Sequence, residues 1–177
     1  RGMDGDGIKS VIYGGGPMYL ADIEKAIAIM GQRFIQIYAQ AESPMTITAL
    51  SRRWHESREY LSSVGLAESA VELRITGEDG QALEAGEVGE IEVKGPAVML
   101  GYWNDPEATA EALRDGWLRT GDIGVLDEDG FLTLRDRSKD MIVSGGSNIY
   151  PREVEEVLLR HADVREAAVV GRPHPEW

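Results

Sequence analysis

The order of apolar segments near the start of the chain is the feature that most restricts its fold. Residues 10–13 and 34–38 are short, mostly apolar runs of strand length. Between them, apolar residues recur at steps of three and four positions: Leu20, Ile23, Ile27 and Met30. This spacing is typical of one face of a helix. A strand, a helix and a second strand with short connections predict a βαβ unit with two parallel strands.

The pattern changes between residues 63 and 135, where short segments alternate apolar and polar residues. Residues 71–75 and 90–93 alternate with period two, which indicates half-buried strands. Residues 127–130, with the sequence Asp-Glu-Asp-Gly, precede another apolar run and predict the turn of a hairpin. Pro106 is well placed to open a short helix. These features predict a small antiparallel sheet or open barrel.

A third unit follows a charged joint at residues 136–140. Residues 141–143 predict a strand, Pro151 opens a predicted helix, and residues 167–170 predict a further strand. About 40 residues are too few to form a stable core alone. We therefore expect this unit to depend on the rest of the protein.

The expected fold is α/β plus β. Residues 1–62 would be the end of a parallel-sheet βαβ subdomain, and residues 63–135 a small antiparallel, barrel-like β subdomain. Residues 136–140 would form a hinge. Residues 141–177 would begin a small, incomplete α+β C-terminal domain.

Charge and composition exclude several classes of function. The chain has 18 Lys and Arg against 31 Asp and Glu, a net charge of −13. This balance argues against nucleic-acid partners and anionic membranes, which need basic surfaces. No apolar run approaches 18 residues, so we expect no transmembrane segment. Cysteine is absent, which excludes disulfides and thiolate sites and is consistent with the cytoplasm.

Two short motifs lie where ligands bind in α/β proteins. Gly14, Gly15, Gly16 and Pro17 follow a strand and precede a helix, where a ligand can approach the backbone. Taken alone, the motif is better explained by a plain tight turn. Residues 38–42 end the next strand, at the edge of the sheet that binds ligands. A solvated strand end is the alternative there.

Further motifs have both a functional and a structural interpretation. Asp122 follows Gly121 and can accept hydrogen bonds from two ribose hydroxyls, or it can cap a turn. Residues 127–130 lack the ligand spacing of a calcium loop and predict a turn. Residues 144–148 form either a loop that admits a thin ligand or a simple connection. The histidines have no ligand spacing, and we expect none to be catalytic: His55, His161 and His174.

Taken together and in order, these motifs resemble the adenylate-forming superfamily, which includes acyl-CoA synthetases, luciferases and adenylation domains. The carrying segments are residues 13–18, 38–42, 89–103, 115–122, 136–142 and 145–155. They extend from about Ser10 to Trp177. The last segment is most similar to carboxylate–CoA ligases, where a Gly-Gly turn precedes an Asn-Ile-aromatic-Pro step.

The resemblance implies a nucleotide site that takes ATP. Its residues would be Gly14, Gly15, Gly16, Tyr38, Ala39, Gln40, Ala41, Asp122 and Arg137. Within it, the glycines border adenine and the acyl group, and Tyr38 stacks on adenine. Asp122 holds the ribose hydroxyls, and Arg137 reaches the ribose or a phosphate.

The resemblance also implies catalytic and CoA-binding residues. Glu42 would ligate Mg²⁺. Lys139 would lie at the hinge about which the C-terminal domain turns. That turn would bring Ser144, Gly145 and Gly146 to the tunnel for CoA, the co-substrate.

The chain departs from the family pattern in places. Ala39 and Ala41 stand where the family usually has Gly and often Thr, so nucleotide affinity is expected to fall. No Ser/Thr/Gly-rich phosphate loop ending in Lys occurs upstream, and the family's catalytic lysine would lie beyond Trp177. Lys139 does not replace that lysine. The chain is thus expected to be a central-to-C-terminal fragment, inactive alone.

The resemblance implies a fragment of an ATP-dependent fatty-acid or other carboxylate–CoA ligase, an acid–thiol ligase of the cytoplasm. Its partners would be a small carboxylic acid, ATP and CoA. The alternatives are an adenylation domain that loads a carrier protein and a non-catalytic remnant that binds nucleotide or another chain. The sequence identifies neither the acid nor the oligomeric state.

Overall fold

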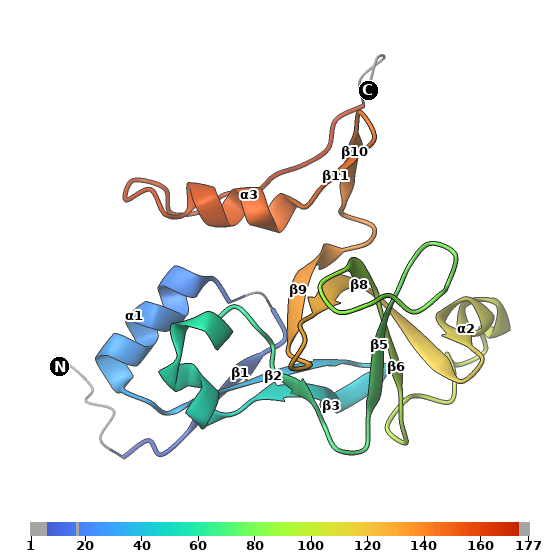
Figure 1. Cartoon of the computed structure of the whole chain (residues 1–177), viewed down its shortest axis with the longest axis horizontal. Coiled ribbons are helices and arrows are strands. Elements are labelled where there is room, and N and C mark those ends of the chain that lie inside the picture. The colour runs from blue at the N-terminus through green and yellow to red at the C-terminus, as the bar shows by residue number, and fades with distance from the viewer. Residues whose placement is uncertain (1–6, 17, 174–177) are drawn as a thin grey trace.

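The computed structural model describes residues 7–16 and 18–173, so Pro17 and His174 of the motifs above lie outside the described residues. Within these ranges the chain forms a four-stranded sheet, a five-stranded sheet, a two-stranded hairpin and three α-helices (Figure 1). The architecture confirms the α/β plus β class. The first sheet is mixed and the second is antiparallel.

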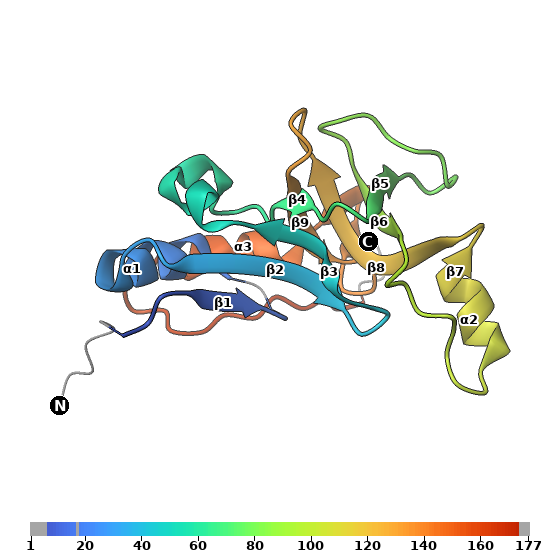
Figure 2. The ribbon, with the colours of Figure 1, turned by 90° about the horizontal axis from the view of Figure 1, so that it is seen from below.

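The first sheet has the strand order β1-β2-β3-β4. β1 (Val11–Gly14) and β2 (Phe34–Gln40) are parallel and are connected through α1 (Leu20–Met30), which confirms the predicted βαβ unit. β3 (Ser43–Leu50) and β4 (Leu66–Ala67) continue the sheet with antiparallel pairing and were not predicted. Figure 2 shows β1, β2 and β3 side by side, with α1 and α3 behind them.

One face of β2 is buried because alternate residues of a strand point to the same side of the sheet. Phe34, Gln36 and Tyr38 are each less than one-tenth exposed. Phe34 packs with Ile23 of α1 and with Leu61. Leu61 follows two 3₁₀ turns, η1 (Arg52–Glu56) and η2 (Arg58–Tyr60).

The second sheet is built around β8 (Trp117–Leu126), which pairs with β6 (Val88–Lys94) on one side. β5 (Glu72–Thr76) lies beyond β6. On its other side, β8 pairs first with β7 (Leu113–Arg114) and then with β9 (Leu132–Arg137).

The predicted helix and turn of this region are confirmed. α2 (Pro106–Ala112) begins after Asp105, whose carboxylate accepts a hydrogen bond from the Ala108 N–H at 2.9 Å. In the β8–β9 turn, Asp127 Oδ1 accepts hydrogen bonds from the N–H groups of Asp129 and Phe131, at 3.0 and 2.8 Å. The Asp127 carboxylate therefore stabilises the turn.

The two sheets share one hydrophobic core. Its buried members come from both sheets: Tyr38, Ile47, Val64, Ile75, Ile91, Val93 and Leu132. An isolated bridge between Gly65 and Leu132 connects the sheets at backbone level. The sheets therefore form a single packed body.

The C-terminal unit consists of a hairpin and a helix. β10 (Ile142–Ser144) and β11 (Ser147–Ile149) pair across Gly145 and Gly146, and α3 (Pro151–Leu158) follows. The φ angles of Gly145 and Gly146 are 58° and 81°. Two-residue hairpin loops need positive φ, which glycine adopts without strain.

The strand predicted at residues 167–170 is wrong, since these residues are irregular. A strand requires a neighbour that satisfies its backbone, and here the Val169 N–H instead donates to Glu155 Oε1 of α3 at 2.9 Å. Asp136 and Arg137, expected in the joint, form the end of β9. None of the helices in the described ranges is long and apolar enough to cross a bilayer.

Candidate functional site

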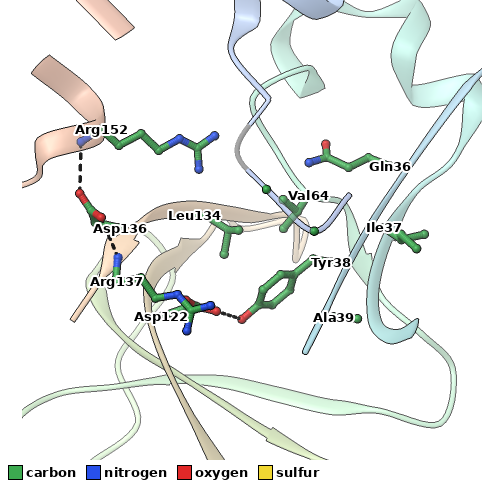
Figure 3. A pocket seen from close by; sticks show the side chains of 12 residues that line it. Gln36, Ile37, Tyr38, Ala39, Val64, Asp122, Leu134, Asp136, Arg137 and Arg152 are labelled. Atoms are coloured by element: carbon green, nitrogen blue, oxygen red, sulfur yellow. Dashed lines mark hydrogen bonds and ion pairs between the residues drawn. The ribbon is translucent and has the colours of Figure 1, made fainter. Parts of the chain in front are cut away.

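A cavity of about 230 Å³ opens where the first sheet, β8, β9 and α3 meet (Figure 3). Its lining residues are Gly15, Gly16, Gln36, Ile37, Tyr38, Ala39, Val64, Asp122, Leu134, Asp136, Arg137 and Arg152. Six of them belong to the expected nucleotide site. The fold therefore gathers residues from β2, β8 and β9 that are up to a hundred positions apart in sequence.

Asp122 on β8 is the centre of a hydrogen-bond network that joins the two sheets. Its Oδ2 accepts hydrogen bonds from the Tyr38 hydroxyl at 2.6 Å and from Gln40 Nε2 at 2.7 Å. Its Oδ1 pairs with Arg137 Nε at 2.9 Å. Asp122 and Arg137 are direct partners in the β8–β9 ladder, so strand register alone makes them neighbours.

The Tyr38 ring is held in a fixed position in the wall of the cavity. Tyr38 is only 7% exposed, and burial together with the adjacent Asp122 carboxylate raises the pKa of its hydroxyl far above the usual range. The hydroxyl therefore stays protonated and keeps donating to Asp122. Gln40 also donates to the Thr120 carbonyl at 2.9 Å, which fixes its amide beside the same carboxylate.

The three glycines differ in their surroundings. Gly14 ends β1, and a Cβ there would collide with the Ile37 carbonyl oxygen of β2. Close packing of two strands therefore requires this glycine. Gly15 has a φ of 77° with open space around it, and Gly16 is also uncrowded. Gly15 and Gly16 line the cavity and leave room for a ligand against the backbone.

Other expected site residues lie outside the lining of this cavity. Ala41 and Glu42 form the β2–β3 turn. Lys139 lies in the turn after β9 and lines a separate open groove of the C-terminal unit. Ser144, Gly145 and Gly146 lie at the tip of the β10–β11 hairpin.

Glu42 offers one carboxylate to a cation. Its Oε1 accepts a hydrogen bond from the Tyr102 hydroxyl at 2.8 Å, which raises the pKa of that tyrosine. In the described ranges, no three His, Cys, Asp or Glu residues cluster as a metal site. Mg²⁺ is commonly bound by one or two carboxylates together with substrate phosphates and water. A single glutamate is compatible with that mode.

Sequence analysis missed Gln36, Asp136 and Arg152 in the cavity lining. Gln36 could have been found, because it is two residues before Tyr38 and thus shares its face of β2. The other two depend on tertiary contacts. Asp136 accepts hydrogen bonds from the N–H of Arg137 at 2.8 Å and from the N–H of Arg152 at 3.2 Å.

Gln36 is part of a buried polar chain behind the cavity. The Tyr13 hydroxyl lies 3.3 Å from Gln36 Oε1 and 3.0 Å from His55 Nε2. His55 Nδ1 lies 3.1 Å from the Ser51 carbonyl oxygen, so it carries the proton and Nε2 accepts from Tyr13. Burial lowers the pKa of His55 and raises that of Tyr13 to about 12.

The AMP-binding enzyme family matches residues 2–103, and its C-terminal domain matches residues 153–177. The chain belongs to the AMP-binding enzyme family. A long-chain-fatty-acid–CoA ligase from Yersinia pestis is 41% identical over 97% of this chain and 30% of its own length. The resemblance expected from the motifs is thereby confirmed.

Solved structures of AMP-binding enzymes share this fold. An amide bond synthetase from Marinactinospora thermotolerans is 46% identical, with a TM-score of 0.89 over 94% of this chain and 34% of its own. The O-succinylbenzoate coenzyme A synthetase of Bacillus subtilis in complex with AMP is 42% identical. Its TM-score is 0.86 over 97% of this chain and 35% of its own. The chain thus spans about a third of the length of its relatives.

Proposed function

We propose that this chain is part of an ATP-dependent carboxylate–CoA ligase and carries the ribose and adenine side of its nucleotide site. The observation that supports this most directly is the Asp122 network at the cavity, in which Tyr38, Gln40 and Arg137 converge on one carboxylate. The named relatives include CoA ligases for fatty and aromatic acids. A fatty or other organic acid is therefore the proposed substrate class.

The proposed reaction has two steps. A carboxylate oxygen of the acid attacks the α-phosphorus of ATP, which forms an acyl-adenylate and releases pyrophosphate. The thiol sulfur of CoA then attacks the acyl carbon, which forms the thioester, releases AMP and frees the thiol proton. The residues of this chain contribute mainly by positioning and by charge stabilisation.

Ribose binding would rearrange the Asp122 network. A carboxylate has about four lone-pair positions, and the contacts of Asp122 with Tyr38, Gln40 and Arg137 use three. Two ribose hydroxyls therefore need one of these contacts to be released. The side chain of Arg137 is 53% exposed, so it is the partner most easily displaced. Arg137 would then be free to contact the ribose or a phosphate.

The remaining expected residues keep their proposed roles. Glu42 would hold Mg²⁺, which neutralises phosphate charge during displacement. Lys139 lies in the turn between β9 and the C-terminal unit, where a rotation axis would have to pass. The β10–β11 hairpin would bring Ser144, Gly145 and Gly146 to the CoA arm after that rotation.

Acid-dependent exchange of radiolabelled pyrophosphate into ATP tests this proposal on the protein that contains the chain. We expect exchange with a subset of a panel of fatty and aromatic acids, followed by AMP release when CoA is added. Thioester formation with CoA should exceed amide formation with amines, the acceptor class suggested by the amide bond synthetase. Saturable ATP binding without exchange would contradict the proposal and favour a non-catalytic nucleotide binder, which Ala39 and Ala41 would then explain.

A further inference from the structure

We propose that Arg152, carried by α3 of the C-terminal unit, binds the phosphate of the nucleotide in the cavity. This inference rests on the proposed function, because it takes the ligand to be a nucleotide. Figure 3 shows the Arg152 side chain extending from α3 across the cavity, on the side away from Asp122. The ribose site and this guanidinium therefore face the same space.

Two cations line the cavity among the described residues, and in the observed arrangement only Arg152 is not paired with a carboxylate. Arg137 becomes available only after ribose hydroxyls displace it from Asp122. Arg137 is paired with Asp122, and the Asp136 carboxylate accepts two backbone N–H groups. In the part of the chain that the structure describes, Arg152 makes no ion pair with a carboxylate. Its Nη2 donates a long hydrogen bond to the Met18 carbonyl oxygen, at 3.5 Å. A planar guanidinium can donate two parallel hydrogen bonds to two oxygens of one phosphate.

The anchoring of α3 explains why Arg152 reaches the cavity. The Asp136 carboxylate accepts the Arg152 N–H at 3.2 Å, and Arg135 of β9 pairs with Glu153 at 2.7 Å. Both contacts place the first turn of α3 beside β9. The Tyr19 hydroxyl adds a long hydrogen bond to Glu155 Oε2, at 3.4 Å.

A coupling between nucleotide and C-terminal unit follows from this placement. Along the chain, Asp122 precedes the turn at residues 138–140 and Arg152 follows it. Movement of α3 away from β9 would therefore withdraw Arg152 from the cavity and leave Asp122 in place. A phosphate that binds more tightly when α3 is docked on β9 than when α3 has moved away would favour the docked arrangement. Loss of the phosphate would favour release of α3.

Calorimetric titration with AMP and with adenosine tests this role, because adenosine lacks the phosphate. For R152Q we expect the Kd of AMP to rise by about 10- to 100-fold, as befits a charged hydrogen bond. The Kd of adenosine should stay unchanged, and R152K should recover part of the AMP affinity. R160Q is the matched control, because Arg160 is an exposed cation of the same unit.

The outcomes separate this inference from the proposed function. D122A should weaken both AMP and adenosine, since Asp122 is assigned to the ribose. If D122A weakens both ligands but R152Q and R152K leave AMP binding unchanged, the role of Arg152 is wrong and the nucleotide site stands. Equal weakening of AMP and adenosine by R152Q would reduce Arg152 to a structural role. If D122A changes neither affinity, the proposed nucleotide site itself is overturned.

Discussion

Asp122 is 7% exposed, and its two oxygens contact three side chains from two sheets. In the full-length protein, Asp122→Ala should reduce ATP affinity by about 3 kcal/mol, roughly 100-fold, through loss of the charged hydrogen bonds that we propose to the ribose. Equilibrium binding of ATP measures this effect. Glu128→Ala, which removes an exposed carboxylate of the β8–β9 turn, is the control. An unchanged ATP dissociation constant for Asp122→Ala would disprove the assignment.

His55 is 2% exposed, and burial lowers its pKa below the ordinary value of 6.5. Below pH 6.5 the unfolded chain binds a proton at this residue while the folded chain does not. The free energy of unfolding should therefore fall as the pH drops from 6.5 toward the lowered pKa. Above pH 6.5, the contribution of the neutral His55 to stability is fully present. Denaturant unfolding at several pH values measures this effect. The free energy of unfolding should depend less on pH for His55→Asn than for His161→Asn. The same pH dependence of the free energy of unfolding in both variants would contradict a buried, neutral His55.

At the scale of elements, the β1–β2 pair depends on Gly14. Gly14→Ala should destabilise the fold by about 1–3 kcal/mol, because its methyl group would collide with the Ile37 carbonyl oxygen. Gly16→Ala should change stability by no more than about 0.5 kcal/mol, since the space around Gly16 is open. Thermal unfolding of the two variants measures the difference. Equal destabilisation would mean that strand packing does not explain Gly14.

Local patterns predicted the elements whose stability depends on short-range features. β1, α1 and β2 follow from apolar spacing, and the β8–β9 turn follows from its Asp and Gly residues. β3 escaped prediction although residues 45–49 alternate apolar and polar residues, and Pro44 near its start weakens the strand signal. The apolar run at residues 167–170 predicted a strand, but within the described ranges these residues pair with no other strand.

The candidate site was predictable to the extent that the family motifs carry it. The motifs indicated Asp122 and Tyr38 separately, but their 2.6 Å hydrogen bond depends on how the two sheets pack. Arg152 lies thirty residues after Asp122 and enters the cavity only because α3 docks on β9. Periodicity contains no information about such a contact.

At the scale of the whole molecule, the turn after β9 is the connection between the packed sheets and the C-terminal unit. The Arg137 carbonyl oxygen accepts hydrogen bonds from the N–H groups of Asp140 and Met141, at 3.1 and 3.2 Å. Lys139→Pro would fix φ in this turn and restrict rotation. We expect thioester formation to fall more than adenylation, as measured by CoA-dependent AMP release and pyrophosphate exchange. Lys139→Ala is the control for charge, and equal loss in both half-reactions would argue against a hinge.

The shared core and the docking of α3 differ in their chemistry. Within the described ranges, neither apolar cluster contains a residue after Leu134, whereas α3 is held to β9 by an ion pair and a hydrogen bond whose side chains are partly exposed. Swinging α3 away would expose little apolar surface, so the heat-capacity change of that motion should be small. Salt, in contrast, screens exposed charge pairs. Ionic strength, more than temperature, should therefore set the fraction of time for which α3 covers the cavity.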